Sequence, residues 1–198
     1  MWRDKASPMS LGRLRRNGFI LIEYRKGSIV MKAELYRKLK AAAEIKRAAA
    51  RLEDLEDLRK LISATKLNSG DIAEIIIAFL LGNFFRAIDD GAHVYMTADL
   101  DKEGVDFEIV RFHIHYSIQL KWNKKNNRAY RDYIRVIEVG PDPSFKGKIH
   151  LPPEKGAYMF YRLLIESGAY EEDEIYDFDD ERPRFKELCN EAWKIIHF

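Results

Sequence analysis

The stretch "EGVDFEIVRFHIHYSIQLKW", residues 103–122, decides the fold, because it has the pattern of two sheet strands that carry polar side chains among large apolar ones. Side chains alternate between the two faces of a strand. Residues 113–122 therefore divide into an apolar face and a polar face that includes Gln119 and Lys121. Taken alone, this alternation is most simply explained by an antiparallel sheet with one face in water. The rest of the sequence shows whether Asp106, Gln119 and Lys121 form a site.

Composition predicts one globular domain with a substantial core, because 46% of the 198 residues are hydrophobic. The longest apolar run, residues 75–82, is far shorter than the roughly 20 residues that span a bilayer, and no secretory signal opens the chain. The single cysteine, Cys189, excludes an internal disulfide and a Cys-rich zinc site. We therefore expect a cytoplasmic protein without a membrane partner.

Charge is unevenly distributed along the chain, although the net charge is only +2. Residues 1–40 hold eleven bases and three acids, and residues 121–135 hold six bases and one acid. Both basic segments could follow the phosphates of a nucleic acid, although a solvated surface explains a single charge run equally well. Residues 171–181 hold eight acids and no base. We interpret this acidic run as a solvated loop or a mask for a basic neighbour.

The first 65 residues are predicted to form a β-hairpin followed by a helical arm. The segment "GFILIEYRKGSIV", residues 18–30, predicts a hairpin that turns at Arg25 to Ser28. From about Ala33 to Ala64, apolar residues recur at spacings of three and four, which indicates an amphipathic helix or helix pair. Its apolar seam is narrow and needs the core or another copy to cover it, so we expect a homodimer. Residues 66–198 are expected to form the core domain.

A buried helix is predicted next, over "DIAEIIIAFLLGNFFRAI" at residues 71–88, after capping residues at 68–71. Glu74 lies in its first turns among isoleucines. Burying an unpaired carboxylate costs several kcal/mol, so a cation or hydrogen bonds should compensate Glu74. A structural alternative is that Glu74 favours the helix N-terminus or pairs with a lysine. Strands are expected at 93–97, 105–110, 115–122 and 133–140.

Several familiar sites are excluded. The segment "DLDKEG", residues 99–104, opens like a calcium loop, but Val110 stands where the twelfth position needs a glutamate. The histidines of "FHIHY" have no third His or Cys at a zinc-site spacing. No nucleophile elbow and no glycine-rich phosphate loop is present.

The remaining polar residues resemble the active-site pattern of the PD-(D/E)xK nuclease superfamily. The resemblance consists of Glu74 on a helix, the step "GVD" at Asp106, and "QLK" at Gln119 to Lys121, in a helix–strand–strand–strand order over residues 68–140. Two features depart from the pattern: Gln119 replaces a common glutamate, and no proline precedes Asp106. The arm and the highly charged composition are also similar to small nucleases of archaeal viruses, for which the location would be the host cytoplasm.

The resemblance implies a restriction-endonuclease-like α/β fold, with a mixed central sheet flanked by helices and the N-terminal hairpin and arm added. It also implies a Mg²⁺-dependent (or Mn²⁺-dependent) deoxyribonuclease. Asp106, Gln119, the Leu120 carbonyl and Glu74 would hold the metal, and Lys121 would position the attacking water. A turn near Arg111 to Ile114, which no glycine or proline marks, has to bring Asp106 and Lys121 to one face.

The segment after Lys121 mixes bases with aromatic side chains, which suits contact with phosphates and stacking on bases. We therefore expect DNA as the partner. The alternatives are a non-catalytic nucleic-acid-binding protein with the same fold and a purely structural helical dimer. The expected nucleic-acid contacts are Trp122, Lys124, Lys125, Arg128, Tyr130 and Arg131.

Overall fold

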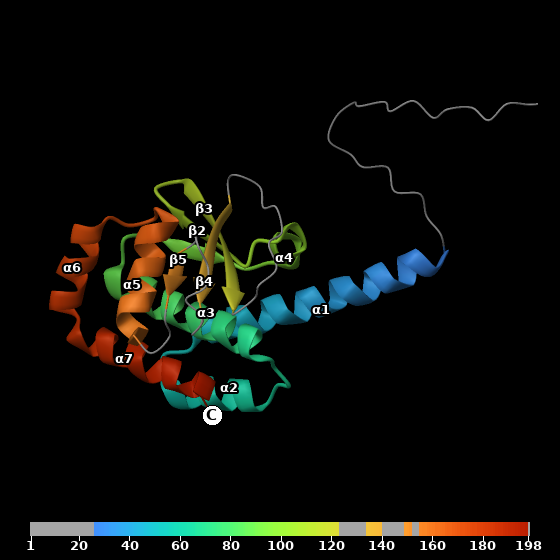
Figure 1. Ribbon diagram of the computed structural model, residues 1–198, viewed down its shortest axis with the longest axis horizontal. Helices are drawn as coiled ribbons and strands as arrows, with labels where there is room; N and C mark the ends of the chain where they lie inside the picture. The colour runs from blue at the N-terminus through green and yellow to red at the C-terminus, as the bar shows by residue number, and fades with distance from the viewer. Residues whose placement is uncertain (1–25, 123–133, 140–148, 152–154, 198) are drawn as a thin grey trace, which may run out of the picture.

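The computed structural model describes residues 26–122, 134–139, 149–151 and 155–197 (Figure 1). The helices are α1 (Lys26–Arg51), α2 (Leu55–Ser63), α3 (Ser69–Ile88), α4 (Ala98–Glu103), α5 (Gly156–Ser167), α6 (Glu172–Glu181) and α7 (Pro183–Lys194), followed by the 3₁₀ turn η2 (Ile195–His197). The strands are β1 (His93–Tyr95), β2 (Phe107–Arg111), β3 (Ile114–Trp122), β4 (Ile134–Val139) and β5 (Ile149–Leu151).

Helix α3 is the centre of the core, as its apolar sequence predicts. Its N-terminus forms a capping box, in which Asn68 accepts from the backbone of Asp71 and the Asp71 carboxylate accepts from the backbone of Asn68. Helix α1 packs directly on α3 at Gly82, where an added Cβ would lie 1.9 Å from the carbonyl oxygen of Ala50. This close approach needs glycine and fixes the position of α1 against the core.

The five strands form one sheet in the order β1-β2-β3-β4-β5. Strands β1, β2 and β3 are antiparallel, and β4 and β5 extend the sheet in parallel. The turn between β2 and β3 has two residues, Phe112 and His113, both with positive φ (50° and 64°). Two positive φ angles are the geometry of a type I′ hairpin turn, which usually contains Asn or Gly. The predicted turn is therefore confirmed without its usual residues.

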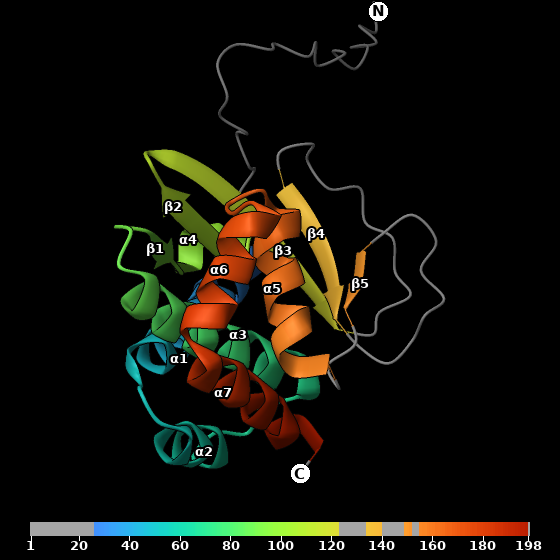
Figure 2. The same ribbon diagram turned by 90° about the vertical axis from the view of Figure 1, so that its left-hand side faces the viewer.

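The helices form a layer against one face of the sheet (Figure 2). Phe107, Ile109, Ile118 and Leu120 of β2 and β3 are buried in the same core as α3, α5 and α7. Phe84 of α3 is the hub of an aromatic cluster, with ring centroids of Phe160, Tyr170, Phe178 and Phe185 at 4.6 to 5.8 Å. On the other face of β3, His115 is exposed, and Ser117 and Lys121 are partly exposed.

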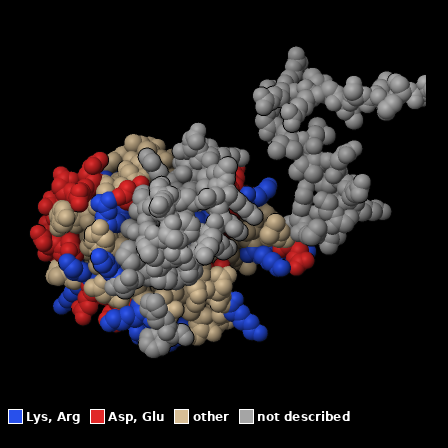
Figure 3. Space-filling view, in the orientation of Figure 1, with Lys and Arg blue, Asp and Glu red and all other residues tan. Residues whose placement is uncertain are grey.

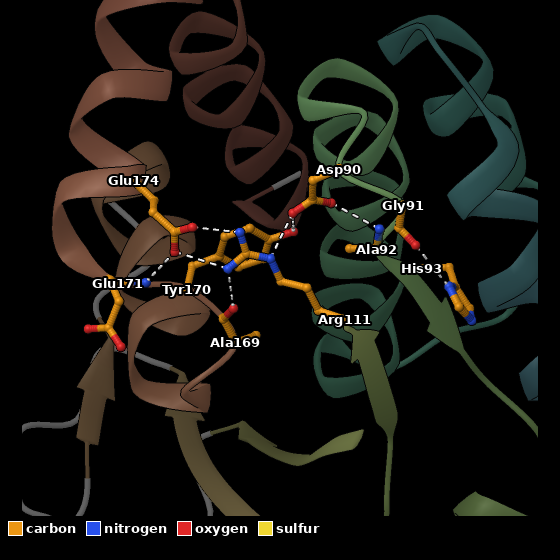
Figure 4. Close-up of polar contacts among 9 residues, drawn as sticks. All are labelled: Asp90, Gly91, Ala92, His93, Arg111, Ala169, Tyr170, Glu171 and Glu174. Atoms are coloured by element: carbon orange, nitrogen blue, oxygen red, sulfur yellow. Dashed lines mark hydrogen bonds and ion pairs between the residues drawn. The ribbon is translucent and has the colours of Figure 1, made fainter. Parts of the chain in front are cut away.

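Arg111, at the end of β2, joins the sheet to the C-terminal helices (Figure 4). Its guanidinium donates to Asp90 Oδ2 at 2.7 Å, to the Ala169 carbonyl at 2.9 Å and to both carboxylate oxygens of Glu174 at 3.0 and 2.6 Å. It also lies 4.0 Å from the centroid of the Tyr170 ring. This network fixes the start of α6 on the sheet.

The acidic run at residues 171–181 is a helix and not the expected loop. Glu172, Asp173 and Glu174 lie in the first turn of α6, where negative charge is favoured by the helix dipole. Helix α6 carries seven acids, and Asp and Glu side chains gather at this end of the molecule in Figure 3.

The predicted fold class is wrong. A restriction-endonuclease-like mixed central sheet flanked by helices was expected, but the described chain is mostly helical, with a small sheet. The antiparallel part has three strands, two of them no longer than five residues, and the long helices pack against one face. The physical reason is that segments expected as turn and loop, residues 98–103 and 172–181, are capped helices.

The predicted N-terminal hairpin is also wrong in its second half, because residues 26–30 are the first residues of α1. Its first half lies outside the described residues. The division at residue 65 stays a prediction. The amphipathic helix pair is confirmed as α1 and α2. The apolar seam packs on the core from Ile45 onward, whereas Leu35, nearer the start of α1, is 57% exposed. The homodimer stays a prediction. In the described part of the chain, no helix is long and apolar enough to cross a membrane.

Candidate active site

The predicted acids Glu74 and Asp106 lie close together at the junction of α3, α4 and β2. Asp106 follows α4, which ends at Gly104 with φ of 87°. A Cβ on Gly104 would lie 3.3 Å from Gln119 Nε2, so glycine gives both the positive φ and the space beside Gln119. The "GVD" step is therefore a helix C-cap that delivers Asp106 to the start of β2.

Asp106 is held by the neighbouring strand. Its backbone N–H donates to the Ile118 carbonyl at 2.9 Å, and its carboxylate Oδ2 accepts from the Leu120 N–H at 2.7 Å. Burial raises the pKa of Asp106, while the positive charges of Lys46 and Lys121 and the Leu120 hydrogen bond act in the opposite direction. The carboxylate is thus oriented by β3 but poorly solvated.

Glu74 is a second acid that is unfavourable in its charged form. Burial, followed by the negative charge of Asp106, raises the pKa of Glu74 to about 8, although the Lys46 ammonium opposes the shift. Its side chain is 27% exposed. Burial is thus the first cause of the raised pKa of both acids, and the nearby lysine charge only partly opposes it.

Lys46 of α1 is the site residue that sequence reasoning missed. Its ammonium Nζ lies 2.7 Å from Asp101 Oδ1, 3.2 Å from the Asp106 carbonyl oxygen and 3.4 Å from Glu74 Oε2. The signal for it was present: Ala43, Lys46 and Ala49 share one helix face at spacings of three, and all three are buried. A lysine on a buried stripe needs an acidic partner.

Asp101 of α4 completes the acidic cluster, the name used here for Glu74, Asp101 and Asp106. Its side chain is 8% exposed, and its buried Oδ2 has no hydrogen-bond partner among the described residues. Within the same part of the chain, Gln119 Oε1 is also buried without a partner, on a residue that is 6% exposed. Buried polar atoms normally have partners, so these two oxygens could accept from a donor or a cation beyond the described side chains.

Lys121 lies on the same face of β3 as Gln119, two residues along the strand. Its positive charge opposes the increase in the Asp106 pKa that burial causes. Glu74, Asp106, Gln119 and Lys121, four residues that the sequence singled out, therefore belong to one region of the structure.

A metal ion is compatible with these residues, although the acids do not enclose one by themselves. In the described ranges, no group of three or more His, Cys, Asp or Glu side chains is arranged to hold a metal ion. The predicted set contains only two acids and adds neutral oxygens from Gln119 and Leu120. Mg²⁺ is commonly bound by one or two carboxylates with waters and substrate phosphates, so this donor set fits it.

A cavity of about 390 Å³ between α1 and the start of α3 leads to the acidic cluster. Lys46 and Glu74 line it, together with Lys38, Lys66 and Asp71. Lys38 and Lys66 are exposed. The cavity therefore borders the cluster with charges of both signs.

The predicted nucleic-acid contacts lie outside the described residues, except for the backbone of Trp122 at the end of β3. These undescribed positions are Lys124, Lys125, Arg128, Tyr130 and Arg131.

Comparisons with family models, with curated proteins and with solved structures found no match for this chain.

Proposed function

We propose that this protein is a metal-dependent nuclease that hydrolyses phosphodiester bonds of DNA. The observation that supports the proposal best is the pair of neighbouring, partly buried acids, Glu74 and Asp106, whose pKa values are raised although Lys46 already lies beside them. A site that still favours protonated acids binds additional positive charge.

The residues present divide into ligands and supporting groups. Asp106 is the principal anionic ligand, and the unpartnered Gln119 Oε1 and the Leu120 carbonyl are neutral oxygen donors for Mg²⁺ or Mn²⁺. When bound, the ion neutralises the phosphodiester charge and lowers the pKa of a water. The Leu120 N–H holds the Asp106 carboxylate in place, so the principal ligand is oriented before an ion binds.

In this proposal, Lys121 positions the attacking water. It lies beside Gln119 on β3, and its charge acts on Asp106. An ammonium at this place orients the water and stabilises the negative charge that develops on the phosphate oxygens. The side chain is partly exposed, which leaves it accessible to a substrate.

The proposal is tested by cleavage of labelled DNA with Mg²⁺ or Mn²⁺, comparing wild type with Asp106→Asn and Lys121→Met. Asparagine keeps an acceptor oxygen for the Leu120 N–H, so the variant should fold. We expect each change to reduce the cleavage rate on the order of a hundred- to a thousandfold. DNA affinity should be largely kept, because the phosphate contacts are expected elsewhere.

The matched controls are Asp99→Asn and Lys102→Ala, which remove exposed charges from nearby α4 and should leave cleavage unchanged. Cleavage at the wild-type rate in Asp106→Asn would contradict the proposal. One observation favours the alternative of a non-catalytic DNA-binding protein: the Lys46 ammonium already neutralises part of the acidic cluster. DNA binding by wild type without cleavage of linear or branched substrates would support that alternative.

A further inference from the structure

Lys46 is surrounded by oxygen atoms in the way that a bound cation is. Its Nζ contacts a carboxylate from α4 (Asp101), a carboxylate from α3 (Glu74) and the backbone carbonyl of Asp106, at 2.7 to 3.4 Å. Lys46 is 55 and 60 residues away in sequence from Asp101 and Asp106, so the fold brings the ammonium to these oxygens. Hard divalent cations are also bound by carboxylate and carbonyl oxygens.

The ammonium is held in a fixed position. The Lys46 side chain is 3% exposed, and the ring of Phe107 covers it, with the Nζ 5.3 Å from the ring centroid. The part of α1 around Lys46 is fixed by its neighbours, because Arg47 Nη1 donates to the Met96 carbonyl at 2.9 Å and Gly82 packs on Ala50. A buried charge is retained only where it is compensated, so Lys46 and the acidic cluster depend on each other.

Charge balance limits the number of metal ions at this site. In their ionised forms Glu74, Asp101 and Asp106, together with one substrate phosphodiester, carry four negative charges, and Lys46 and Lys121 carry two positive charges. One divalent ion neutralises the remainder, whereas a second would leave an excess of two positive charges in a poorly solvated site. Uncompensated buried charge is strongly unfavourable.

We propose that Lys46 is the built-in cation of the acidic cluster and takes the place of a second metal ion, so that the chain binds one divalent ion, at Asp106 and Gln119. This inference rests on the proposed function. In this inference the carboxylates of Glu74 and Asp101 compensate the charge of the Lys46 ammonium and do not bind the metal ion. Helix α1, which carries Lys46, is then part of the site. Lys46 is a positioning residue, since it acts through the acids and not on the phosphate.

The test counts Mn²⁺ ions bound to the full chain without DNA, using the electron paramagnetic resonance signal of free Mn²⁺. We expect one ion in wild type and one in Lys46→Arg. Lys46→Met should also bind one ion, but more tightly than wild type, because the neutral side chain adds one uncompensated negative charge to the site. The double variant Lys46→Met with Asp101→Asn removes one charge of each sign, so it should return to the wild-type affinity. Lys60→Met, which removes an exposed lysine paired with Asp57, is the control and should bind one ion with the wild-type affinity.

The outcomes separate this inference from the proposed function. Two ions in wild type, or a folded Lys46→Met variant that binds Mn²⁺ no more tightly than wild type, would overturn the role of Lys46 and leave the nuclease proposal standing. Absence of Mn²⁺ binding in wild type would overturn the metal-dependent function itself. If Lys46→Met does not fold, the wild-type count and the charge-balanced double variant still decide the question.

Discussion

At the scale of single residues, the site is defined by burial of charge. Glu74 could be predicted because a carboxylate in an otherwise apolar helix has to be compensated, and Asp106, Gln119 and Lys121 interrupt apolar strands in the same way. Lys46 could not be predicted with the same ease. It lies in a helix rich in Lys, Arg and Glu, where one more base looks like part of the solvated face. Only packing against α3 and α4 shows that it points inward.

The raised pKa of Glu74 predicts a pH dependence of stability in the metal-free protein. Between the ordinary glutamate pKa and about 8, the folded state holds a proton that the unfolded state has lost. The free energy of unfolding should therefore decrease as pH rises from about 5 to about 8. Glu74→Gln should reduce this slope and raise stability at pH 8 by about 1 to 3 kcal/mol. Urea unfolding of both proteins at several pH values, with chelator present, measures the effect.

Asp106, whose pKa is raised in the same direction, keeps part of the slope in the variant. Glu103→Gln, an exposed change on α4, is the control and should leave the slope intact. A Glu74→Gln protein that is less stable than wild type at pH 8 would show that the ion pair with Lys46 outweighs the burial of the charge.

At the scale of elements, capping residues and apolar periodicity predicted more of the secondary structure than the alternation of polar and apolar side chains did. The start of α3 at residues 68–71 and the positions of β2 and β3 follow from local signals. The hairpin prediction was wrong because residues 31–50 are rich in Ala, Lys, Glu and Leu, good helix formers, and a helix once formed extends at little cost into residues 26–30. The acidic run was misinterpreted because negative charges that suggest a loop also stabilise a helix N-terminus.

The junction between the sheet and α6 depends on Arg111, which no local signal marked. Its side chain is 10% exposed and pairs with Asp90 and Glu174, so Arg111→Met removes the guanidinium donor from two acids and from the Ala169 carbonyl. Asp90 keeps the Tyr170 hydroxyl as a donor, and Glu174 keeps the backbone N–H of Glu171. We expect a loss of about 3 kcal/mol of unfolding free energy, in the range for breaking a buried pair. Thermal or urea unfolding measures it.

Arg162→Met, which removes an α5 arginine paired with Glu166 at a more exposed position, is the matched control and should cost less than about 1 kcal/mol. DNA cleavage per folded molecule should be unchanged in Arg111→Met, because Arg111 lies apart from the acidic cluster in its contacts. An equal loss of stability in both variants would mean that the Arg111 network adds nothing beyond an ordinary surface pair.

At the scale of the whole molecule, the sequence predicted a single core but not how the layers are arranged. Four strands were expected to be central, yet α3 is the central element and the helices cover one face of the sheet. Packing between elements that are distant in the sequence decides between these arrangements, and the periodicity of apolar residues within one element gives no information about that packing. The charge distribution was visible from the sequence. The acids of α6 gather at one end of the molecule, and α4, which carries Asp101, lies toward the other end (Figures 1 and 3).

The basic run at residues 121–135 leads to the last prediction, which concerns binding and not cleavage. If Lys124, Lys125 and Arg128 contact phosphates, replacing all three with alanine removes three sites of counterion release. The slope of log affinity against log salt should then become shallower by about 2 to 3, with weaker binding at low salt. Fluorescence anisotropy with labelled DNA, in an Asp106→Asn background that prevents cleavage, measures the slope.

The control is a triple alanine variant at the exposed positions Lys60, Lys102 and Arg184, which makes the same change in net charge elsewhere on the protein. If that control flattens the slope equally, the effect belongs to overall charge, and the run after Lys121 is ordinary solvated surface.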